Sequence, residues 1–308
     1  MKPLDFLVIG AQKCATTTLF EHLRSHPKIA MPIEKEVPFF SSDECSAQSW
    51  RQYADLHFAN ARPDQLWGKA TPQYMCDPLA AARIHRSMPQ VKLIAILRDP
   101  ISRSLSHHKM GQRRETEARS YDETFSALLE AEPIHGDAAQ LPPHHEQGYQ
   151  SESDFYISWS EYGRILSDFL EHFPATQLLV LYTEELQEKP QETLDRLLEF
   201  IGLEPGFNPP TLGKVIHRGG SRKRIPQSVR ERLRNIKALH RLWQLLPETH
   251  RGRLRFRYEQ WNISKRENPE ELSDELREAL QEHYSRDLRK LLQLPVSPPP
   301  WAERYGLH

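Results

Sequence analysis

The sequence has little cysteine, no long hydrophobic run and no excess of charge, and each shortage excludes a class of protein. Its three cysteines, Cys14, Cys45 and Cys76, form neither a disulfide framework nor a CxxC zinc pattern, which favours a reducing compartment. Lys and Arg total 41 and Asp and Glu total 42, so the chain lacks the basic excess of a general nucleic-acid or membrane-surface binder. The apolar stretches are too short for a signal peptide or a membrane span. We therefore expect a soluble, cytoplasmic protein that binds no nucleic acid.

The length and the apolar pattern predict a single α/β domain over residues 1–308. With 38% hydrophobic residues, the chain can bury a sizeable core. Continuous apolar runs at residues 6–10, 91–98 and 177–182 predict strands of a parallel sheet that is covered on both faces. Helical spacing at residues 161–173 and 190–203, on either side of the last run, predicts flanking helices. These patterns predict a three-layer sandwich with a central parallel sheet.

Residues 111–160 interrupt this pattern with charged, Pro-rich and His-rich sequence that is too long for an ordinary connection. We predict an insertion that forms a lid. Its aromatic residues either close over a ligand or pack in the core: Tyr121, Phe125, Tyr149, Phe155 and Tyr156. His144 and His145 have no second pair at zinc-ligand spacing, so we predict no metal site. A strong amphipathic helix is predicted at residues 271–292.

The segment after the first predicted strand reads GAQKCATTTL, residues 10–19, and leads into a helix. Such a unit places backbone N–H groups and the positive end of a helix at the carboxyl edge of a sheet, where an anion binds. Gly10 permits the turn, Lys13 adds positive charge, and three successive threonines add hydroxyl donors. The spacing departs from the GxxxxGK[ST] motif of nucleotide triphosphatases. We favour an anion-binding loop over its alternative, an ordinary helix start with a surface lysine.

This loop resembles the phosphosulfate-binding loop of sulfotransferases that use 3'-phosphoadenosine 5'-phosphosulfate (PAPS), as does the His-Pro pair at residues 26–27. Three further segments resemble family motifs in the expected order: KEVPFF at 35–40, GKATPQY at 68–74 and LRDPISRSLSHH at 97–108. The pattern is similar above all to bacterial relatives of the heparan sulfate sulfotransferases. The resemblance implies a P-loop-like fold and metal-free, in-line transfer of a sulfuryl group from PAPS to a hydroxyl. The insertion would then be a lid over the acceptor site.

The resemblance also assigns the nucleotide site. Arg98 and Ser106 would hold the 3'-phosphate, whereas an Arg98–Asp99 ion pair is the alternative for that arginine. Thr17 and Thr18 would hold the 5'-phosphate, and Thr16 would shape the turn. The basic loop RGGSRKRIP at residues 218–226 would clamp the nucleotide, although a solvated or nucleic-acid-binding patch would look the same. The predicted PAPS-binding residues are Gly10, Gln12, Lys13, Cys14, Ala15, Thr16, Thr17, Thr18, Arg98, Ser106, Ser221, Arg222, Lys223 and Arg224.

Three residues are predicted to be catalytic by this resemblance. Lys13 would stabilise the charge that grows on the departing oxygen. Glu36 matches a glutamate base, whose pKa burial and neighbours would raise toward working pH. His107 is the second candidate base, because it matches a frequent family histidine and other sulfotransferase branches use a histidine base, the alternative being a packed or solvated histidine. Pro38 is a separate departure, since it replaces the usual histidine near Glu36. Lys69 stands where many relatives carry glutamate, and we predict that it binds substrate near the sulfonate, the alternative being an exposed lysine.

Other functional classes share the anion-binding loop. An ATP-dependent kinase or triphosphatase would need a Mg²⁺-holding Ser or Thr after Gly-Lys and an acidic partner at a strand end, and neither is in place. A non-catalytic nucleotide-binding module is disfavoured because Lys13, Glu36, Arg98 and Ser106 are all present. Nothing in the sequence selects the acceptor, so a small-molecule or metabolite hydroxyl is predicted by elimination.

Overall fold

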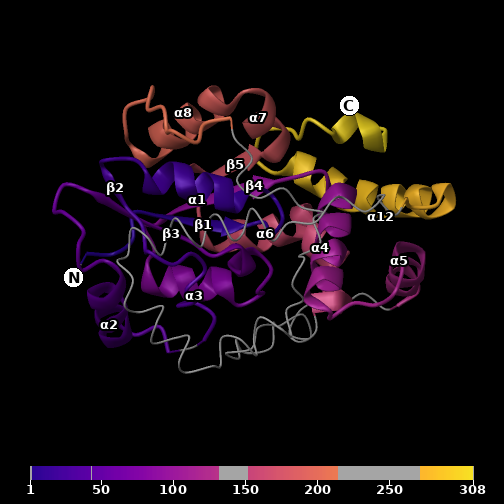
Figure 1. Cartoon of the computed structure of the whole chain (residues 1–308), viewed down its shortest axis with the longest axis horizontal. Coiled ribbons are helices and arrows are strands. Elements are labelled where there is room, and N and C mark those ends of the chain that lie inside the picture. The colour runs from indigo at the N-terminus through magenta and orange to yellow at the C-terminus, as the bar shows by residue number, and fades with distance from the viewer. Residues whose placement is uncertain (1, 43, 132–151, 214–270, 308) are drawn as a thin grey trace, which may run out of the picture.

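The computed structural model describes residues 2–42, 44–131, 152–213 and 271–307. At its centre lies a parallel sheet of five strands in the order β2-β3-β1-β4-β5. The strands are β1 (Phe6–Gly10), β2 (Ile29–Ala30), β3 (Leu66–Ala70), β4 (Lys92–Leu97) and β5 (Leu178–Tyr182). Helices labelled α1, α7 and α8 lie on one side of this sheet, and α2 and α3 lie on the other (Figure 1). This arrangement confirms the predicted three-layer α/β sandwich.

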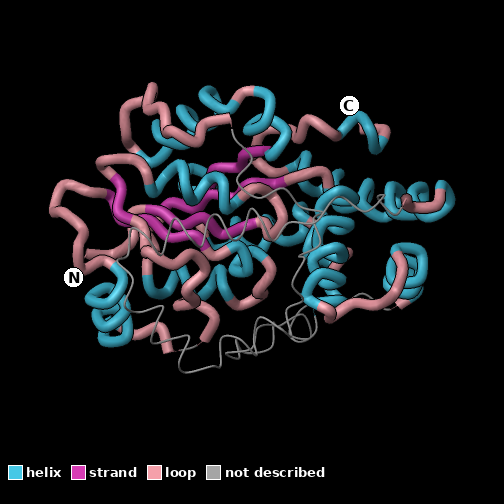
Figure 2. The backbone as a smooth tube through the Cα atoms, in the orientation of Figure 1, coloured by secondary structure: helices cyan, strands magenta, loops and turns pink. Residues whose placement is uncertain are grey.

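The helices surround the strands in the tube view (Figure 2). The α-helices are α1 (Thr16–Arg24), α2 (Ala47–His57), α3 (Ala80–Ser87), α4 (Pro100–Arg114), α5 (Tyr121–Glu130), α6 (Tyr162–His172), α7 (Thr183–Glu188), α8 (Pro190–Ile201) and α12 (Asp274–Gln293). Short 3₁₀ helices are η1 (Pro72–Met75), η3 (Glu152–Phe155), η4 (Ser158–Ser160), η5 (Ala175–Gln177) and η6 (Ala302–Tyr305). Helix α12 begins and ends close to the predicted 271–292.

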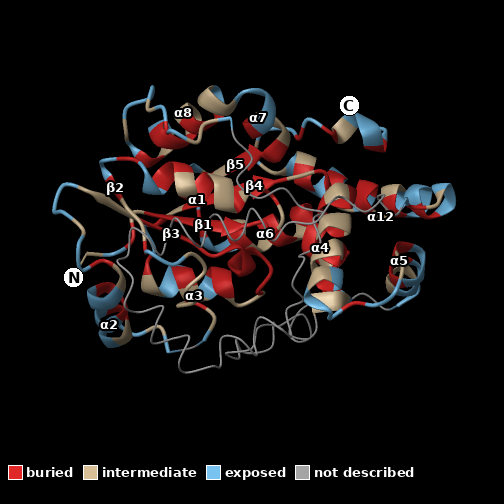
Figure 3. Ribbon diagram, viewed as in Figure 1, coloured by how far each residue is buried: buried red, intermediate tan, exposed pale blue. Residues whose placement is uncertain are grey.

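The three predicted strands are β1, β4 and β5, and every residue of β1 is buried (Figure 3). Strand β3 was not predicted, because its sequence LWGKA combines glycine and lysine. Both residues have a structural reason to be there. A Cβ at Gly68 would lie 2.0 Å from the ring of Phe6, so only glycine lets β3 pair with β1 at that point. Lys69 is buried and its contacts are described below.

The segment 111–160 is more regular than predicted where the structure describes it. Helix α4 continues to Arg114, α5 follows, and residues 152–160 form η3 and η4. Four of the five aromatic residues pack in the core rather than over a ligand: Tyr121, Phe125, Phe155 and Tyr156. The fifth, Tyr149, lies outside the described residues with His144 and His145. The lid therefore stays a prediction.

Helix α12 packs along α6 and closes its amino-terminal end. The Asp287 carboxylate accepts one hydrogen bond from the backbone N–H of Gly163 and one from that of Arg164, each 2.8 Å long. The first N–H groups of a helix have no partner inside the helix, so a side chain from another element replaces the usual cap. This contact joins the last long helix to the layer that covers the sheet.

Replacing Asp287 by alanine should lower the free energy of unfolding by about 1–2 kcal/mol, because two buried N–H groups lose their acceptor. Burial raises the pKa of Asp287 to about 6. The native protein then holds a proton that the unfolded chain has lost, so this contribution to stability declines as the pH rises from about 4 to 6. Chemical denaturation at several pH values measures both effects. Glu282→Ala, at an exposed ion pair with Arg286 on the same helix, is the control and should change stability by less than about 0.5 kcal/mol.

Candidate active site

The segment between β1 and α1 lies at the carboxyl edge of the sheet, beside the end of β4. The backbone N–H of Ala11 donates to the carbonyl of Ile96 at 2.8 Å, which joins the two strand ends. A Cβ at Gly10 would lie 2.5 Å from Cβ of Met75, so this glycine is needed for the close approach of η1. Within the loop, a left-handed backbone is found at Lys13, with φ 74°. Parallel strand order thus brings the segments of residues 10–19 and 97–108 together.

The geometry of the loop leaves backbone N–H groups available for an anion. Ala15 also has a positive φ, 59°, and alternating left- and right-handed residues turn successive N–H groups toward one point. Helix α1 begins at Thr16 without a side-chain cap, so its first-turn N–H groups have no intrahelical partner. The threonines divide in their environment: Thr16 is buried and its Oγ1 accepts from Nζ of Lys35 at 3.4 Å, whereas Thr17 and Thr18 are partly exposed.

Two other loop residues face the interior. The Cys14 thiol is fully buried and lies 3.8 Å from the hydroxyl of Tyr162. Burial raises the pKa of Cys14 to about 11, so it stays a protonated thiol and offers a ligand only its backbone. The amide oxygen of Gln12 is buried and has no hydrogen-bond partner among the described residues. These contacts hold the base of the loop.

Lys13 lies among guanidinium groups. Its Nζ is 3.8 Å from Sδ of Met110, and no carboxylate of the described residues forms an ion pair with it. Burial lowers the pKa of Lys13 to about 8. This lowering includes a smaller contribution from the positive charges of Arg113, Arg114, Arg103 and Arg98. A partly buried cation surrounded by other cations is costly without an anion, so this arrangement fits a ligand with several negative charges.

Arg98 follows β4 and belongs to this group. Among the residues that the structure describes, its guanidinium has no hydrogen bond or ion pair. Asp99 is otherwise occupied: its Oδ1 accepts from the backbone N–H of Ser102 at 2.8 Å and its Oδ2 from the hydroxyl of Tyr305 at 3.0 Å. The alternative of an Arg98–Asp99 ion pair is therefore wrong. Ser106 lies on α4, partly exposed, on the same helix as Met110.

Glu36 lies at the edge of the same region, in the segment between β2 and α2. Its backbone N–H donates to the carbonyl of Ala70 at 3.1 Å, and it has a positive φ of 68°. The carboxylate forms an ion pair with Lys35 and accepts from Nε2 of Gln73 at 3.5 Å. Burial alone would raise the pKa of Glu36, but Lys35 and Gln73 outweigh it and the pKa is lowered. The prediction of a raised pKa is wrong, and the carboxylate is ionised at neutral pH.

His107 has neither an exposed atom nor an available nitrogen. Its Nδ1 faces Nη1 of Arg103 at 3.4 Å, and because guanidinium only donates, Nδ1 is the acceptor. The other nitrogen, Nε2, therefore carries the proton and donates to Glu152 at 2.9 Å. Burial lowers the pKa of His107 to about 4, so the ring is neutral. This geometry argues against His107 as a base and gives it a structural role instead.

Comparison with known proteins agrees with this geometry. The sulfotransferase domain model matches residues 3–291. The chain belongs to the sulfotransferase family. This family uses PAPS and releases adenosine 3',5'-bisphosphate, so the kinase and triphosphatase alternative is not favoured. The loops around Lys13 and Arg98 combine N–H groups without an intrahelical partner, hydroxyls and cations that form no ion pair among the described residues.

Relatives of this sulfotransferase-family chain include large proteins. It is 28% identical over 205 residues to heparan sulfate glucosamine 3-O-sulfotransferase 3B1 of Mus musculus, covering 64% of this chain and 46% of that protein. It is 36% identical over 104 residues to membrane-associated sulfotransferase kil1 of Dictyostelium discoideum, covering 34% and 22%. The matches thus span less than half the length of these relatives. A sulfotransferase from Alicyclobacillus acidocaldarius shares the fold, with a TM-score of 0.63, 20% identity and coverage of 95% and 96%.

Lys69 is buried inside this sulfotransferase domain. Its side chain is 1% exposed, and Nζ donates to the carbonyl of Val37 and, at 2.6 Å, to Oγ1 of Thr71. The alternative of an exposed lysine is wrong, and contact with the sulfonate stays a prediction. Strand β3 is buried on both faces, so a lysine in it faces the interior whichever way it points.

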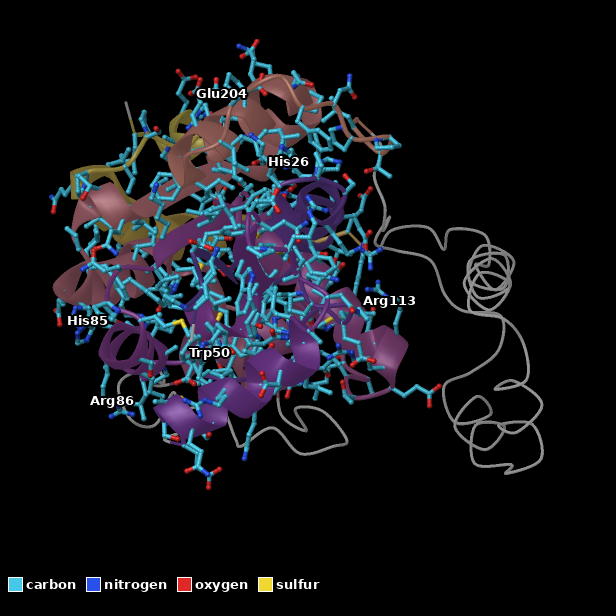
Figure 4. All side chains as sticks on the ribbon, turned by 90° about the vertical axis from the view of Figure 1, so that its left-hand side faces the viewer. His26, Trp50, His85, Arg86, Arg113 and Glu204 are labelled. Carbon is cyan, nitrogen blue, oxygen red and sulfur yellow. The ribbon has the colours of Figure 1, made fainter. Side chains whose placement is uncertain are left out.

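Arg113 and Arg114 were not predicted. Counted from Ser106 on α4, Met110 stands at i+4, Arg113 at i+7 and Arg114 at i+8. This spacing puts the four side chains on one face of the helix. Arg113 has no ion pair among the described side chains, whereas Arg114 lies 3.4 Å from Glu152. Figure 4 shows Arg113 at the rim of the molecule, on the opposite side from His85 and Arg86. The helical face was the signal in the sequence that could have identified them.

The remaining predictions concern the basic loop, metal binding and membrane spans. The basic loop with Ser221, Arg222, Lys223 and Arg224 lies in a range that the structure does not describe. Within the described ranges, no group of three His, Cys, Asp or Glu side chains could hold a metal ion. In those same ranges, no helix is both long and apolar enough to cross a membrane.

Proposed function

We propose that this chain transfers the sulfuryl group of PAPS to a hydroxyl group of an acceptor. The observation that carries the proposal is that Lys13 and Arg98, which have no ion pair among the described residues, lie at the same edge of the sheet as the ionised Glu36, which is hydrogen-bonded to the end of β3. The loop N–H groups, Thr17 and Thr18 would hold the 5'-phosphate. Arg98 and Ser106 would hold the 3'-phosphate.

Glu36 and Lys13 have separate roles in the proposed transfer, one in accepting the proton and the other in stabilising negative charge. Glu36 accepts the proton of the attacking hydroxyl as its oxygen bonds to sulfur. Lys13 stabilises the negative charge on the bridging oxygen when the sulfur–oxygen bond to the phosphate breaks. The products are the sulfated acceptor, the bisphosphate and a proton on Glu36. The lowered pKa keeps this carboxylate ionised and able to accept the proton, which the hydroxyl loses only as the new bond forms.

For the acceptor, we propose a small-molecule hydroxyl, as the sequence suggested by elimination. An acceptor with an anionic group is favoured by one observation, the half-buried Arg113 that lacks an ion-pair partner among the described residues and lies near Lys13. Relatives named as heparan sulfate enzymes make a sulfated polysaccharide the second candidate. The buried thiols Cys14 and Cys76 support a reducing compartment, and we propose the cytoplasm.

A thermal shift tests the nucleotide site. Adenosine 3',5'-bisphosphate at about 100 times its Kd, with EDTA present, should stabilise the protein by about 2.7 kcal/mol and raise Tm by about 5 °C. ADP with Mg²⁺ is the comparison and should have little effect. Stabilisation by ADP with Mg²⁺ alone would replace this function by a kinase or triphosphatase. With labelled PAPS, transfer to phenolic, carboxylated or sugar hydroxyl compounds would support a small acceptor, and transfer to heparan sulfate alone would support the polymer.

A further inference from the structure

The segment of residues 35–40, which carries Glu36, is attached to its neighbours by hydrogen bonds from several elements. The hydroxyl of Tyr74 in η1 accepts from the backbone N–H of Phe39 at 2.7 Å and of Phe40 at 3.1 Å. Strand β3 adds the bond from the Glu36 N–H to Ala70, described above. Its neighbour Lys69 donates to the carbonyl of Val37, the residue after Glu36. The Glu36 backbone is thus anchored from below by β3 and η1.

Lys69 is in a site shaped for an ammonium group. The Val37 carbonyl and the Thr71 hydroxyl accept two of its three N–H bonds. The ring of Tyr74 lies 5.1 Å from Nζ and the ring of Tyr53 lies 5.6 Å from it, both within cation–π range. The carbonyl and the ring faces favour a positive charge, and the Thr71 hydroxyl accepts a hydrogen bond from it.

No carboxylate in the described ranges forms an ion pair with Lys69, and the negative charge that acts on it is that of Glu36. Removing one buried hydrogen-bond partner from such a cation leaves its other partners unsatisfied. The ammonium therefore has a specific geometric task at this point of the fold.

We propose that Lys69 is a positioning residue, which holds the Val37 carbonyl from behind the segment of residues 35–40 and thereby fixes the Glu36 carboxylate at the edge of the site. The effect of Lys69 on sulfuryl transfer rests on the proposed function, in which Glu36 is the base. Its effect on the segment of residues 35–40 does not depend on that function, so the effect on transfer and the effect on the segment are measured separately.

The charge of Lys69 should change as the pH passes through neutrality. Burial lowers the pKa of Lys69 to about 7, and the Glu36 charge opposes this. The titratable groups around it are Glu36 and Lys35 of the segment, Tyr53 and His57 of α2, and Tyr74 of η1. Burial raises the pKa of both tyrosines, so they stay neutral. The bond to the Val37 carbonyl should weaken as the pH rises through about 7, because a charge-assisted hydrogen bond becomes a neutral one.

The experiment compares Lys69→Met with Lys92→Met. Lys92 on β4 makes the same kinds of contact, a 2.6 Å hydrogen bond to the carbonyl of Phe200 and a cation–π contact with its ring, but far along the chain from Glu36. Hydrogen exchange of the backbone amides of residues 35–40 is measured without ligand at pH 6, 7 and 8. In Lys69→Met we expect exchange at least about tenfold faster than in the parent protein, with Lys92→Met unchanged.

The kinetic readout separates positioning from binding. Lys69→Met should lower kcat by about tenfold or more and leave the KM for PAPS within about twofold, since the nucleotide loops are untouched. Lys69→Arg, which keeps the charge, should restore part of the loss. If Lys69→Met fails to fold by circular dichroism, Thr71→Val removes one partner of the ammonium and should speed the same exchange severalfold.

Two results would overturn the inference: unchanged exchange in residues 35–40 of a folded Lys69→Met variant, or equal acceleration in Lys92→Met. A parent protein that binds the bisphosphate but transfers no sulfuryl group would contradict the proposed function instead. In that case the exchange data alone would decide whether Lys69 holds the segment.

Discussion

Lys13→Ala should lower kcat by about 10²–10³-fold while the protein stays folded. The reason is geometric: Lys13 is the ammonium that the loop brings, in a left-handed conformation, among the guanidinium groups of α4 and Arg98. In the proposed mechanism, removing it leaves the charge on the departing oxygen without this cation. Single-turnover kinetics with labelled PAPS measures the loss, and circular dichroism checks the fold.

The pH dependence adds a second test of the same residue. Because the pKa of Lys13 is lowered to about 8, the free protein loses this charge above pH 8, and kcat/KM should fall on that side. Lys13→Arg should move the fall to higher pH. Lys28→Ala, at an exposed lysine beyond α1, should leave the activity and its pH profile as they are. A Lys13→Ala variant with kcat within about threefold of the parent would remove Lys13 from the mechanism.

Glu36→Gln should have the other large effect, a fall in kcat of about 10²–10⁴-fold with the affinity for the bisphosphate retained. Glutamine keeps the size and one hydrogen-bond acceptor of the side chain but accepts no proton. Lys35 and Gln73 hold the pKa of Glu36 below its ordinary value. Protonation of Glu36 should therefore not reduce the activity of the parent enzyme at mildly acidic pH. Steady-state kinetics from pH 5 to 8 checks both statements.

Glu34→Gln, two residues earlier and exposed, provides the matched control and should leave kcat unchanged. His107→Gln distinguishes the two bases that the sequence allowed. It breaks contacts with Arg103 and Glu152, so we expect lower Tm rather than a specific loss of the chemical step. Normal activity in Glu36→Gln together with a folded but inactive His107→Gln variant would reverse the assignment.

Features carried by short stretches of sequence were predicted well. The strands β1, β4 and β5 are continuous apolar runs, and such runs have few alternatives when glycine or charged turns bound them. The loop from Gly10 onward could be placed because a strand and a helix flank it directly. Strands β2 and β3 escaped notice, since the first has two residues and the second takes its glycine and lysine from packing against Phe6 and Val37.

Properties that depend on distant neighbours could not be predicted. The lowered pKa of Glu36 comes first from the adjacent Lys35 and then from Gln73, which lies 37 residues away, and the sequence could not show that these contacts outweigh burial. The burial of His107 likewise requires Glu152 and Arg103 around it. In sequence, Glu36 and His107 are ordinary titratable side chains. The sequence did not predict where the Lys69 side chain points, for another reason. Successive residues of β3 are buried at Lys69, so polar and apolar residues do not alternate there. Arg113 and Arg114 could have been predicted from the sequence, because helical spacing puts them on the same face of α4 as Ser106.

The contacts of the carboxyl-terminal elements have a consequence for how this protein is made. A chain still on the ribosome can expose residues up to 213, with all five strands, before α12 has been synthesised. At that stage Ser104 lacks the hydroxyl of Tyr284, at 2.7 Å in the finished protein, and Asp99 beside Arg98 lacks that of Tyr305. The apolar face of α6 is uncovered as well. Binding competence should therefore arise after the sheet, as a late step in biosynthesis during which chaperones have a surface to bind.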